Sequence, residues 1–68
     1  MFEIDSEMAA KLRERRARKQ LTLQEAANEV GISRLTLGDI ENEKRVRVYR
    51  KVYEKLVNWL INEKMEVK

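Results

Sequence analysis

The side chains that perform most enzyme chemistry are scarce in this sequence. It contains no cysteine and no histidine, and its only serines are Ser6 and Ser33. A serine nucleophile needs a neighbouring base, most often an imidazole, and the common zinc sites use cysteine or histidine. We therefore expect that the protein is not an enzyme and that it has no metal site, no cofactor and no small-molecule substrate.

The chemistry that remains is that of charge, which is unevenly distributed along the chain. The sequence has 15 Lys and Arg against 12 Asp and Glu, a net charge of +3 and a pI near 9.5. Residues 11–20 hold six basic side chains and one acidic one, and residues 44–55 have the same balance. Residues 21–43 hold one basic and five acidic side chains. Basic blocks of this kind contact phosphates or form a solvated face.

The length and the apolar content limit how these charges can be organised. A chain of 68 residues is long enough for one domain, which we assign to residues 1–68. Hydrophobic residues make up 43% and occur in short stretches, so we expect no membrane span and no membrane partner. The acidic start, residues 1–5, lacks the basic and apolar regions of a signal peptide, so we expect a cytoplasmic protein.

Apolar residues at helical spacing predict a long helix near each end of the chain. The first is expected to begin at Asp5 or Ser6, which are good N-caps, and to end around residues 19–20. The last is expected to span roughly residues 47–63, followed by a frayed tail over residues 64–68.

Two short helices with strong capping signals are predicted between them. Thr22 followed by Glu25 forms a capping box, and Gly31 stands where a left-handed C-terminal residue is expected. Ser33 is the next N-cap, and its helix is expected to end near Asn42. Two capped helices joined by a turn of about three residues are the signature of a helix-turn-helix, here over about residues 22–42.

A longer run of residues surrounds this motif at specific spacing. It consists of Leu12, Arg13, Arg16, Leu21, Thr22, Glu25, Ala26, Ala27, Val30, Gly31, Ile32, Ser33, Arg34, Thr36, Leu37, Ile40, Glu41 and Asn42. Over about residues 8–43 the sequence thereby resembles the lambda-repressor-like helix-turn-helix family of Cro/CI or Xre type. The resemblance implies an all-α fold, a compact bundle of four to five helices with a long C-terminal helix. It also implies a transcription regulator, as many members from temperate phages are.

The resemblance gives a structural role to one charged pair. Arg16 and Glu41 match the positions of an Arg–Glu ion pair found inside many family members. Helical spacing agrees, because Arg16 shares a face with Leu12, and Glu41 follows the inward-facing Ile40. A half-buried arginine needs a carboxylate partner, so we expect a structural ion pair here.

In the family, the third helix lies in the major groove of DNA, so its outer side contains the candidate binding residues. Leu37 and Ile40 are expected to face the core, leaving the opposite side for the ligand. The candidates are Arg34, Leu35, Thr36, Gly38, Asp39 and Asn42 on this helix, Leu23 and Gln24 before it, and Lys44, Arg45 and Arg47 after it. Leu23 has a second interpretation, in which it packs against the first helix. The basic residues of the first helix contribute only if its orientation brings them beside Arg34.

Two functions remain open. The first is a small Cro-type repressor that binds double-stranded operator DNA. The second is an antirepressor or modulator whose helix-turn-helix face binds a partner repressor and blocks its DNA binding. An exposed leucine and an acid at the centre of the face favour a protein partner. The residues of that face would be Leu23, Leu35, Asp39 and Asn42.

The last helix also has two interpretations. Its apolar side chains cover more than half of its circumference, which is wider than a single core-facing stripe. Either a homodimer forms through it, or a small fold wraps it deeply. The candidate dimer face is Tyr49, Val57 and Ile61.

Overall fold

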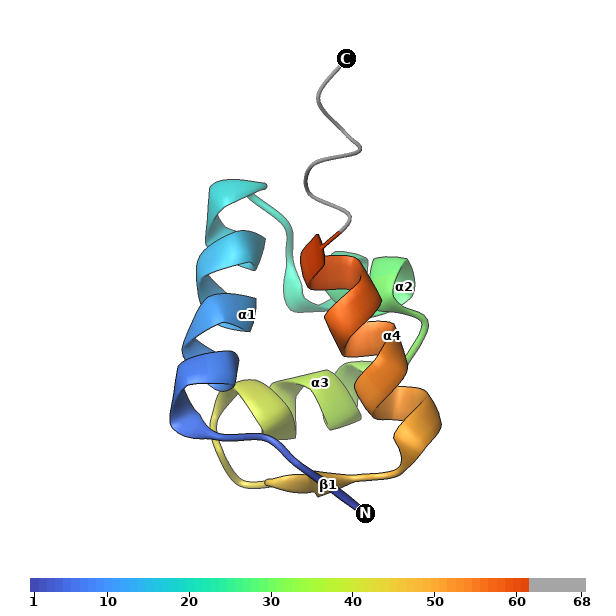
Figure 1. Cartoon of the computed structure of the whole chain (residues 1–68). Helices are drawn as coiled ribbons and strands as arrows, with labels where there is room; N and C mark the ends of the chain where they lie inside the picture. The colour runs from blue at the N-terminus through green and yellow to red at the C-terminus, as the bar shows by residue number, and fades with distance from the viewer. Residues whose placement is uncertain (62–68) are drawn as a thin grey trace.

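In a computed structural model, which describes residues 1–61, four helices surround one core and a short ribbon closes one end (Figure 1). Among these residues, no helix is long and apolar enough to cross a membrane. The four helices confirm the predicted fold class, and the frayed tail predicted for residues 64–68 lies outside the described residues. The elements in chain order are β1 (Phe2–Glu3), α1 (Ser6–Arg18), α2 (Leu23–Val30), α3 (Arg34–Glu41), β2 (Arg47–Val48) and α4 (Arg50–Ile61).

The first three helices begin at the predicted caps. The Asp5 carboxylate accepts a hydrogen bond from the Met8 backbone N–H at 2.8 Å, which satisfies an amide that α1 itself leaves unpaired. Thr22 and Glu25 form the complete capping box of α2, with bonds of 3.1 and 2.8 Å. The Ser33 hydroxyl accepts from the first turn of α3.

The turn between α2 and α3 depends on a glycine. Gly31 has φ +96°, in the left-handed region, where a Cβ would be strained. Its N–H and that of Ile32 both donate to the Ala27 carbonyl, at 2.8 and 3.1 Å. The Lys55 ammonium on α4 donates to the Gly31 carbonyl at 2.9 Å, so the end of α2 is also held from α4. The two helices of the motif are thus joined by a short turn whose glycine is hydrogen-bonded through both its N–H and its carbonyl.

The expected start of the last helix is wrong, because that stretch forms β2 instead. Phe2 pairs with Val48 and Glu3 with Arg47 in an antiparallel ribbon, and α4 begins only at Arg50. The ribbon is extended by the Ile4 N–H, which donates to the carbonyl before β2 at 2.7 Å. The alternation of Arg and Val over residues 45–48 is a period of two, but four residues are too few to distinguish it from a helix.

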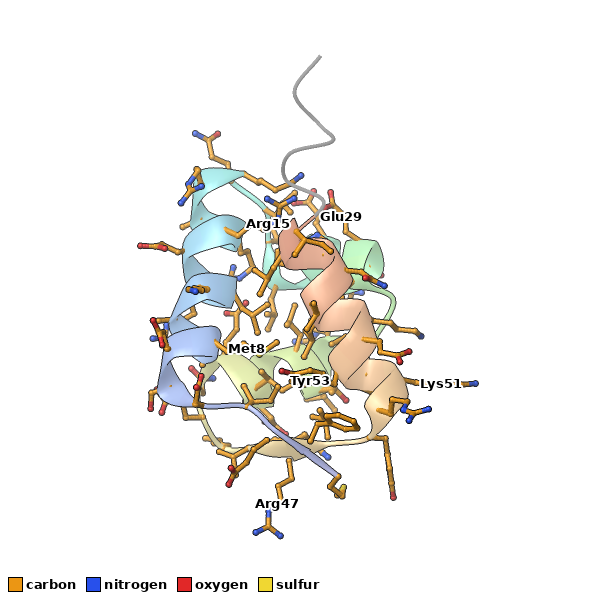
Figure 2. The ribbon with its side chains drawn as sticks, in the orientation of Figure 1. Met8, Arg15, Glu29, Arg47, Lys51 and Tyr53 are labelled. Carbon is orange, nitrogen blue, oxygen red and sulfur yellow. The ribbon has the colours of Figure 1, made fainter. Side chains whose placement is uncertain are left out.

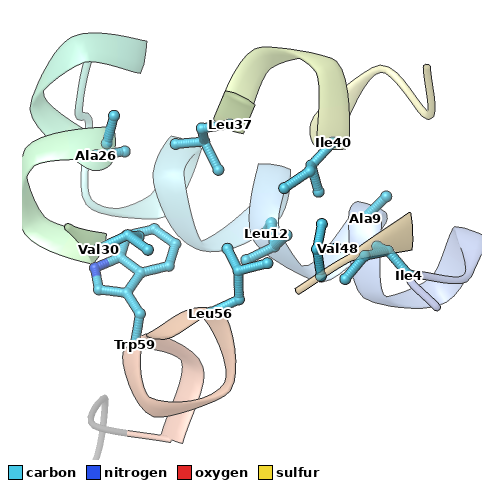
Figure 3. Packing of buried hydrophobic residues seen from close by; sticks show 11 residues of the cluster. Ile4, Ala9, Leu12, Ala26, Val30, Leu37, Ile40, Val48, Leu56 and Trp59 are labelled. Carbon is cyan, nitrogen blue, oxygen red and sulfur yellow. The ribbon is translucent and has the colours of Figure 1, made fainter. Parts of the chain in front are cut away.

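The core lies between α4 on one side and the α2–α3 pair on the other (Figure 3). Leu12, Leu37, Ile40 and Leu56 are its largest fully buried side chains. Its buried hydrophobic residues are Ile4, Ala9, Leu12, Ala26, Ala27, Val30, Leu37, Ile40, Val48, Leu56 and Trp59. This arrangement leaves the outer side of α3 uncovered by the rest of the described chain.

Candidate nucleic-acid interface

Helix α3 buries one side and exposes the other. Leu37 and Ile40 are fully buried, as their spacing predicts, whereas Arg34 and Leu35 lie on the surface. Leu35 is 72% exposed, and Asn42 at the C-cap is exposed as well. A ligand therefore has direct access to this side of the helix. We call Arg34, Leu35, Asp39 and Asn42 the α3 surface.

Two other candidate residues, Leu23 and Gly38, pack against each other within the motif. A Cβ placed on Gly38 would lie 3.1 Å from Leu23 Cδ2, tighter than an ordinary van der Waals contact. Leu23 is half-buried against the core. The structure therefore packs Leu23 against α3 at the point where the start of α2 approaches it, rather than against α1 alone. Both residues hold α2 and α3 together, and little of Leu23 is left to extend the exposed apolar surface.

Gln24 and Thr36 are partly engaged in local hydrogen bonds. The Gln24 amide donates to Asn28 Oδ1 at 3.0 Å along the exposed side of α2. The Ser33 hydroxyl donates to the Thr36 hydroxyl oxygen at 2.8 Å. The Thr36 backbone N–H donates in turn to the Ser33 hydroxyl oxygen at 3.1 Å. Thr36 thus completes the cap of α3, while Gln24 stays accessible at the start of α2.

Arg16 and Glu41 form an ion pair that ties α1 to α3. Arg16 Nε donates to Glu41 Oε2 at 3.0 Å, and Nη2 donates to Oε1 at 3.0 Å. The Glu41 side chain is only 4% exposed, against 29% for Arg16. Arg16 Nη1 also donates to the Leu21 carbonyl at 3.2 Å. This two-pronged pairing neutralises one of the five acids of residues 21–43 inside the fold.

Two further acids of that segment are engaged along α2. Glu25 belongs to the capping box described above. Glu29 accepts a hydrogen bond from Trp59 Nε1 on α4 at 3.0 Å, and the Lys19 ammonium lies 3.7 Å from the same carboxylate. The carboxylates of α2 therefore serve its own cap and its contacts with α1 and α4.

A fourth acid, Glu43, faces α1. It accepts from the Ser6 hydroxyl at 2.8 Å and lies 4.0 Å from an Arg13 guanidinium nitrogen. Among residues 1–61, Asp39 is then the one acid of the segment whose carboxylate makes no hydrogen bond or ion pair within the protein. These acids also form no cluster that could hold a metal ion within the described residues.

The basic residues after α3 fold back against its end. Glu43 adopts φ +61°, which reverses the chain. The N–H groups of Lys44 and Arg45 then both donate to the Asp39 carbonyl, at 2.8 and 3.1 Å. Arg47 follows in β2, and all three basic side chains are exposed. We call residues 44–47 the basic segment; it continues the α3 surface with positive charge.

The basic residues of α1 do not join this surface as one group. Arg15 is buried at 3% exposure, with its guanidinium 5.1 Å from the centroid of the Trp59 ring. Arg13 donates to the Glu41 backbone carbonyl, and Arg18 lines a groove between α1 and α4. The burial of Arg15 was missed, although its position three residues after Leu12 places it near the inward face of the helix.

The candidate dimer residues lie in two separate places. Val57 and Ile61 line the groove between α1 and α4, with Ile61 60% exposed. Tyr49 precedes α4, where its carbonyl accepts from the Tyr53 N–H, and it is 74% exposed outside that groove. Tyr49 thus stands at the N-terminal end of α4, outside the groove that Val57 and Ile61 line.

A family model described as a helix-turn-helix domain matches residues 7–60, from the start of α1 to the end of α4. No curated protein and no solved structure matches the chain. The matched range includes the α3 surface and the basic segment.

Proposed function

This chain belongs to the helix-turn-helix domain family, of Xre/Cro-like type, and from that premise we propose that it is a small Cro/CI-type regulator of transcription. It binds double-stranded operator DNA through the α3 surface and the basic segment. Its setting is a phage-like genetic switch, and a two-fold operator is bound by a homodimer.

The observation that carries the proposal is that most acidic side chains of residues 21–43 make contacts within the protein. Residues 21–43 have an excess of acids, which would repel a polyanion if they faced it. Glu41 is instead buried against Arg16, and Glu29 and Glu43 contact α4 and α1. Glu25 stays exposed in the cap of α2, and Glu43 stays exposed before the basic segment. Within the α3 surface and the basic segment themselves, Asp39 stands against Arg34, Lys44, Arg45 and Arg47. The two named surfaces together therefore hold four bases and one acid, and phosphate neutralisation supplies a large share of the affinity of protein–DNA complexes.

The side chains of the α3 surface suit the edges of bases. Arg34 matches the two acceptors of guanine or a phosphate, and Asn42 matches adenine. Leu35 offers an apolar contact to a thymine methyl group, and the Asp39 carboxylate accepts from a cytosine amino group. We assign sequence reading to these residues and backbone positioning to Lys44, Arg45 and Arg47.

A salt titration tests the proposal. Binding of the full chain to a short fluorescent duplex of mixed sequence is measured by anisotropy at increasing salt. The logarithm of the binding constant should fall by about 0.9 per phosphate contact for each decade of salt. Arg45→Ala should flatten this slope by about 0.9, whereas the control Lys51→Ala, at an exposed site on α4 outside the α1–α4 groove, should leave it unchanged. Absence of binding at low salt would refute DNA binding by this chain.

The second candidate function, an antirepressor, is favoured by one observation. Leu35 is 72% exposed beside Asp39, whose carboxylate makes no hydrogen bond or ion pair among residues 1–61. An apolar centre with an acid suits the basic DNA-reading face of a repressor. With Leu23 packed on Gly38, the apolar part of this face is reduced to Leu35.

The two functions separate in one mobility-shift experiment. A regulator that binds DNA shifts the duplex alone, whereas an antirepressor only removes the shift made by a repressor from the same switch. For the second outcome, Leu35→Asp and Asp39→Lys should abolish the complex with that repressor. Retention of the complex in both variants would exclude the α3 surface as its contact.

A further inference from the structure

A shallow groove runs between α1 and α4, and its apolar part is incompletely covered. Met8 on α1 and Val57, Leu60 and Ile61 on α4 line it, and Ile61 is 60% exposed. Figure 2 shows Met8, Arg15 and Tyr53 around this face of the molecule. Exposed apolar side chains lining a groove favour an occupant that covers them.

One wall of the groove has a regular pattern of charge. Glu7, Lys11, Glu14 and Arg18 line it from α1, all exposed, with spacings of four, three and four residues. These spacings place them in one stripe along the helix, with alternating sign. In the reverse order the signs of the four charges are exchanged, so an antiparallel copy of the stripe places a base opposite each acid. A second α1 lying antiparallel would therefore place Arg18 opposite Glu7, and Glu14 opposite Lys11.

We propose that the occupant is a second copy of this chain, bound through the groove with its α1 antiparallel to the first. Glu3 and Asp5, which precede α1, also line the groove. The stripe on α1 itself has two acids and two bases, so a strongly basic or strongly acidic partner would meet like charge at two of the four stripe positions. Only a partner with the reversed pattern matches all four, and the chain itself supplies that pattern.

The register on α4 agrees with the register on α1. The two helices run in the same direction side by side (Figure 1), and Arg15 lies over the ring of Trp59 at 5.1 Å. Position 15 of α1 thus lies within about one helical turn of the level of position 59 of α4. A two-fold axis midway between Lys11 and Glu14 then passes close to Val57, because both helices rise by the same amount per residue. Val57 would meet its own copy, and Leu60 would lie near Tyr53 of the second copy.

This contact leaves the α3 surface accessible. Leu37 and Ala26, from α3 and α2, lie across the core from Leu56 and Trp59 of α4 (Figure 3). Since the groove is on the α1–α4 side, dimer formation covers none of the α3 surface. The inference deepens the homodimer of the proposed function, but it does not depend on DNA binding.

Sedimentation equilibrium of the full chain without DNA tests the contact. The wild-type chain of 8.1 kDa should show a concentration-dependent mass approaching twice that value. Lys11→Glu places like charges at two symmetric positions and should weaken the dimer about tenfold. Glu14→Lys should do the same, and the double variant, which exchanges the two charges, should recover to within about threefold of wild type. Lys51→Glu is the control of equal charge change, since Lys51 is exposed on α4 outside the groove.

The apolar part has its own matched pair. Ile61→Ser should weaken the dimer, whereas Tyr49→Ser, at an exposed site outside the groove, should not. Circular dichroism of each variant checks that the fold is retained. A chain that stays monomeric, a dimer unaffected by Lys11→Glu and Ile61→Ser, or a double variant that fails to recover would each overturn the proposal. A monomer that binds DNA would overturn this contact and the homodimer but not DNA binding, whereas a dimer that does not bind DNA would overturn DNA binding alone.

Discussion

Removal of the Glu41 carboxylate should destabilise the protein far more than removal of an exposed acid. In Glu41→Ala, the guanidinium of Arg16 loses both prongs of its pairing, at 3.0 Å each. Breaking a buried ion pair from one side costs about 3–5 kcal/mol. Arg16 is 29% exposed and keeps its bond to the Leu21 carbonyl, so water can solvate part of its charge. The loss should therefore lie at the lower end, about 3 kcal/mol.

Urea unfolding followed by circular dichroism and by Trp59 fluorescence measures this loss. A domain of this size has a free energy of unfolding of roughly 3–10 kcal/mol, so the variant should be close to unfolding. Its melting temperature should fall by about 12–24 °C. Glu54→Ala, an exposed acid on α4, is the control and should change stability by less than about 0.5 kcal/mol.

The pair Arg16→Met with Glu41→Leu separates the two causes of the loss. If the unpaired arginine charge is responsible, replacing both partners by apolar side chains should restore most of the stability. If Glu41→Ala alone costs no more than about 0.5 kcal/mol, the pair behaves as a surface contact and the argument from burial is refuted.

Three further substitutions test the packing of the motif by the same urea assay. Gly31→Ala should cost about 1–2 kcal/mol, because alanine is strained at φ +96°, and an unchanged midpoint would contradict this. Gly38→Val should cost about 1–3 kcal/mol by forcing Leu23 away, and Leu23→Ala in the same chain should recover part of the loss. Trp59→Phe lacks the one tryptophan, so its unfolding is followed by circular dichroism alone. It should cost about 1 kcal/mol, since it removes the hydrogen bond to Glu29; equal stability would show that this bond contributes nothing net.

Local signals predicted the helices well. The caps at Asp5, Thr22 and Ser33 and the left-handed Gly31 all occur where they were expected. Each depends on hydrogen bonds between residues three or four apart, so a short stretch of sequence contains the whole interaction. The order of the helices and the inward side of α3 follow from the same local information.

Pairings between distant residues were not predictable in this way. The ribbon that joins Phe2 to Val48 displaced the start of the last helix, and the stacking of Arg15 on Trp59 removed one base from the surface. The count of one basic and five acidic side chains in residues 21–43 also gave a misleading picture of the surface charge, because it ignores contacts with distant residues. Whether an acid such as Glu29 faces solvent or a partner is decided by which helices come together in space.

The ribbon has a consequence for the order in which the chain folds. The contacts that form α2, its turn and α3 are local, whereas the paired residues of β1 and β2 are far apart in the sequence, as Phe2 and Val48 are. Long loops close late, because their entropy is lost before the contacts compensate for it. The ribbon should therefore be the last element to form and the first to open, with Ile4 and Val48 leaving the core together. Amide hydrogen exchange should show the Ile4 N–H exchanging before the amides of α3. Each opening would free the Arg47 backbone from its pairing with Glu3. The pairing of the first few residues with β2 would therefore determine how firmly the basic segment is held in position.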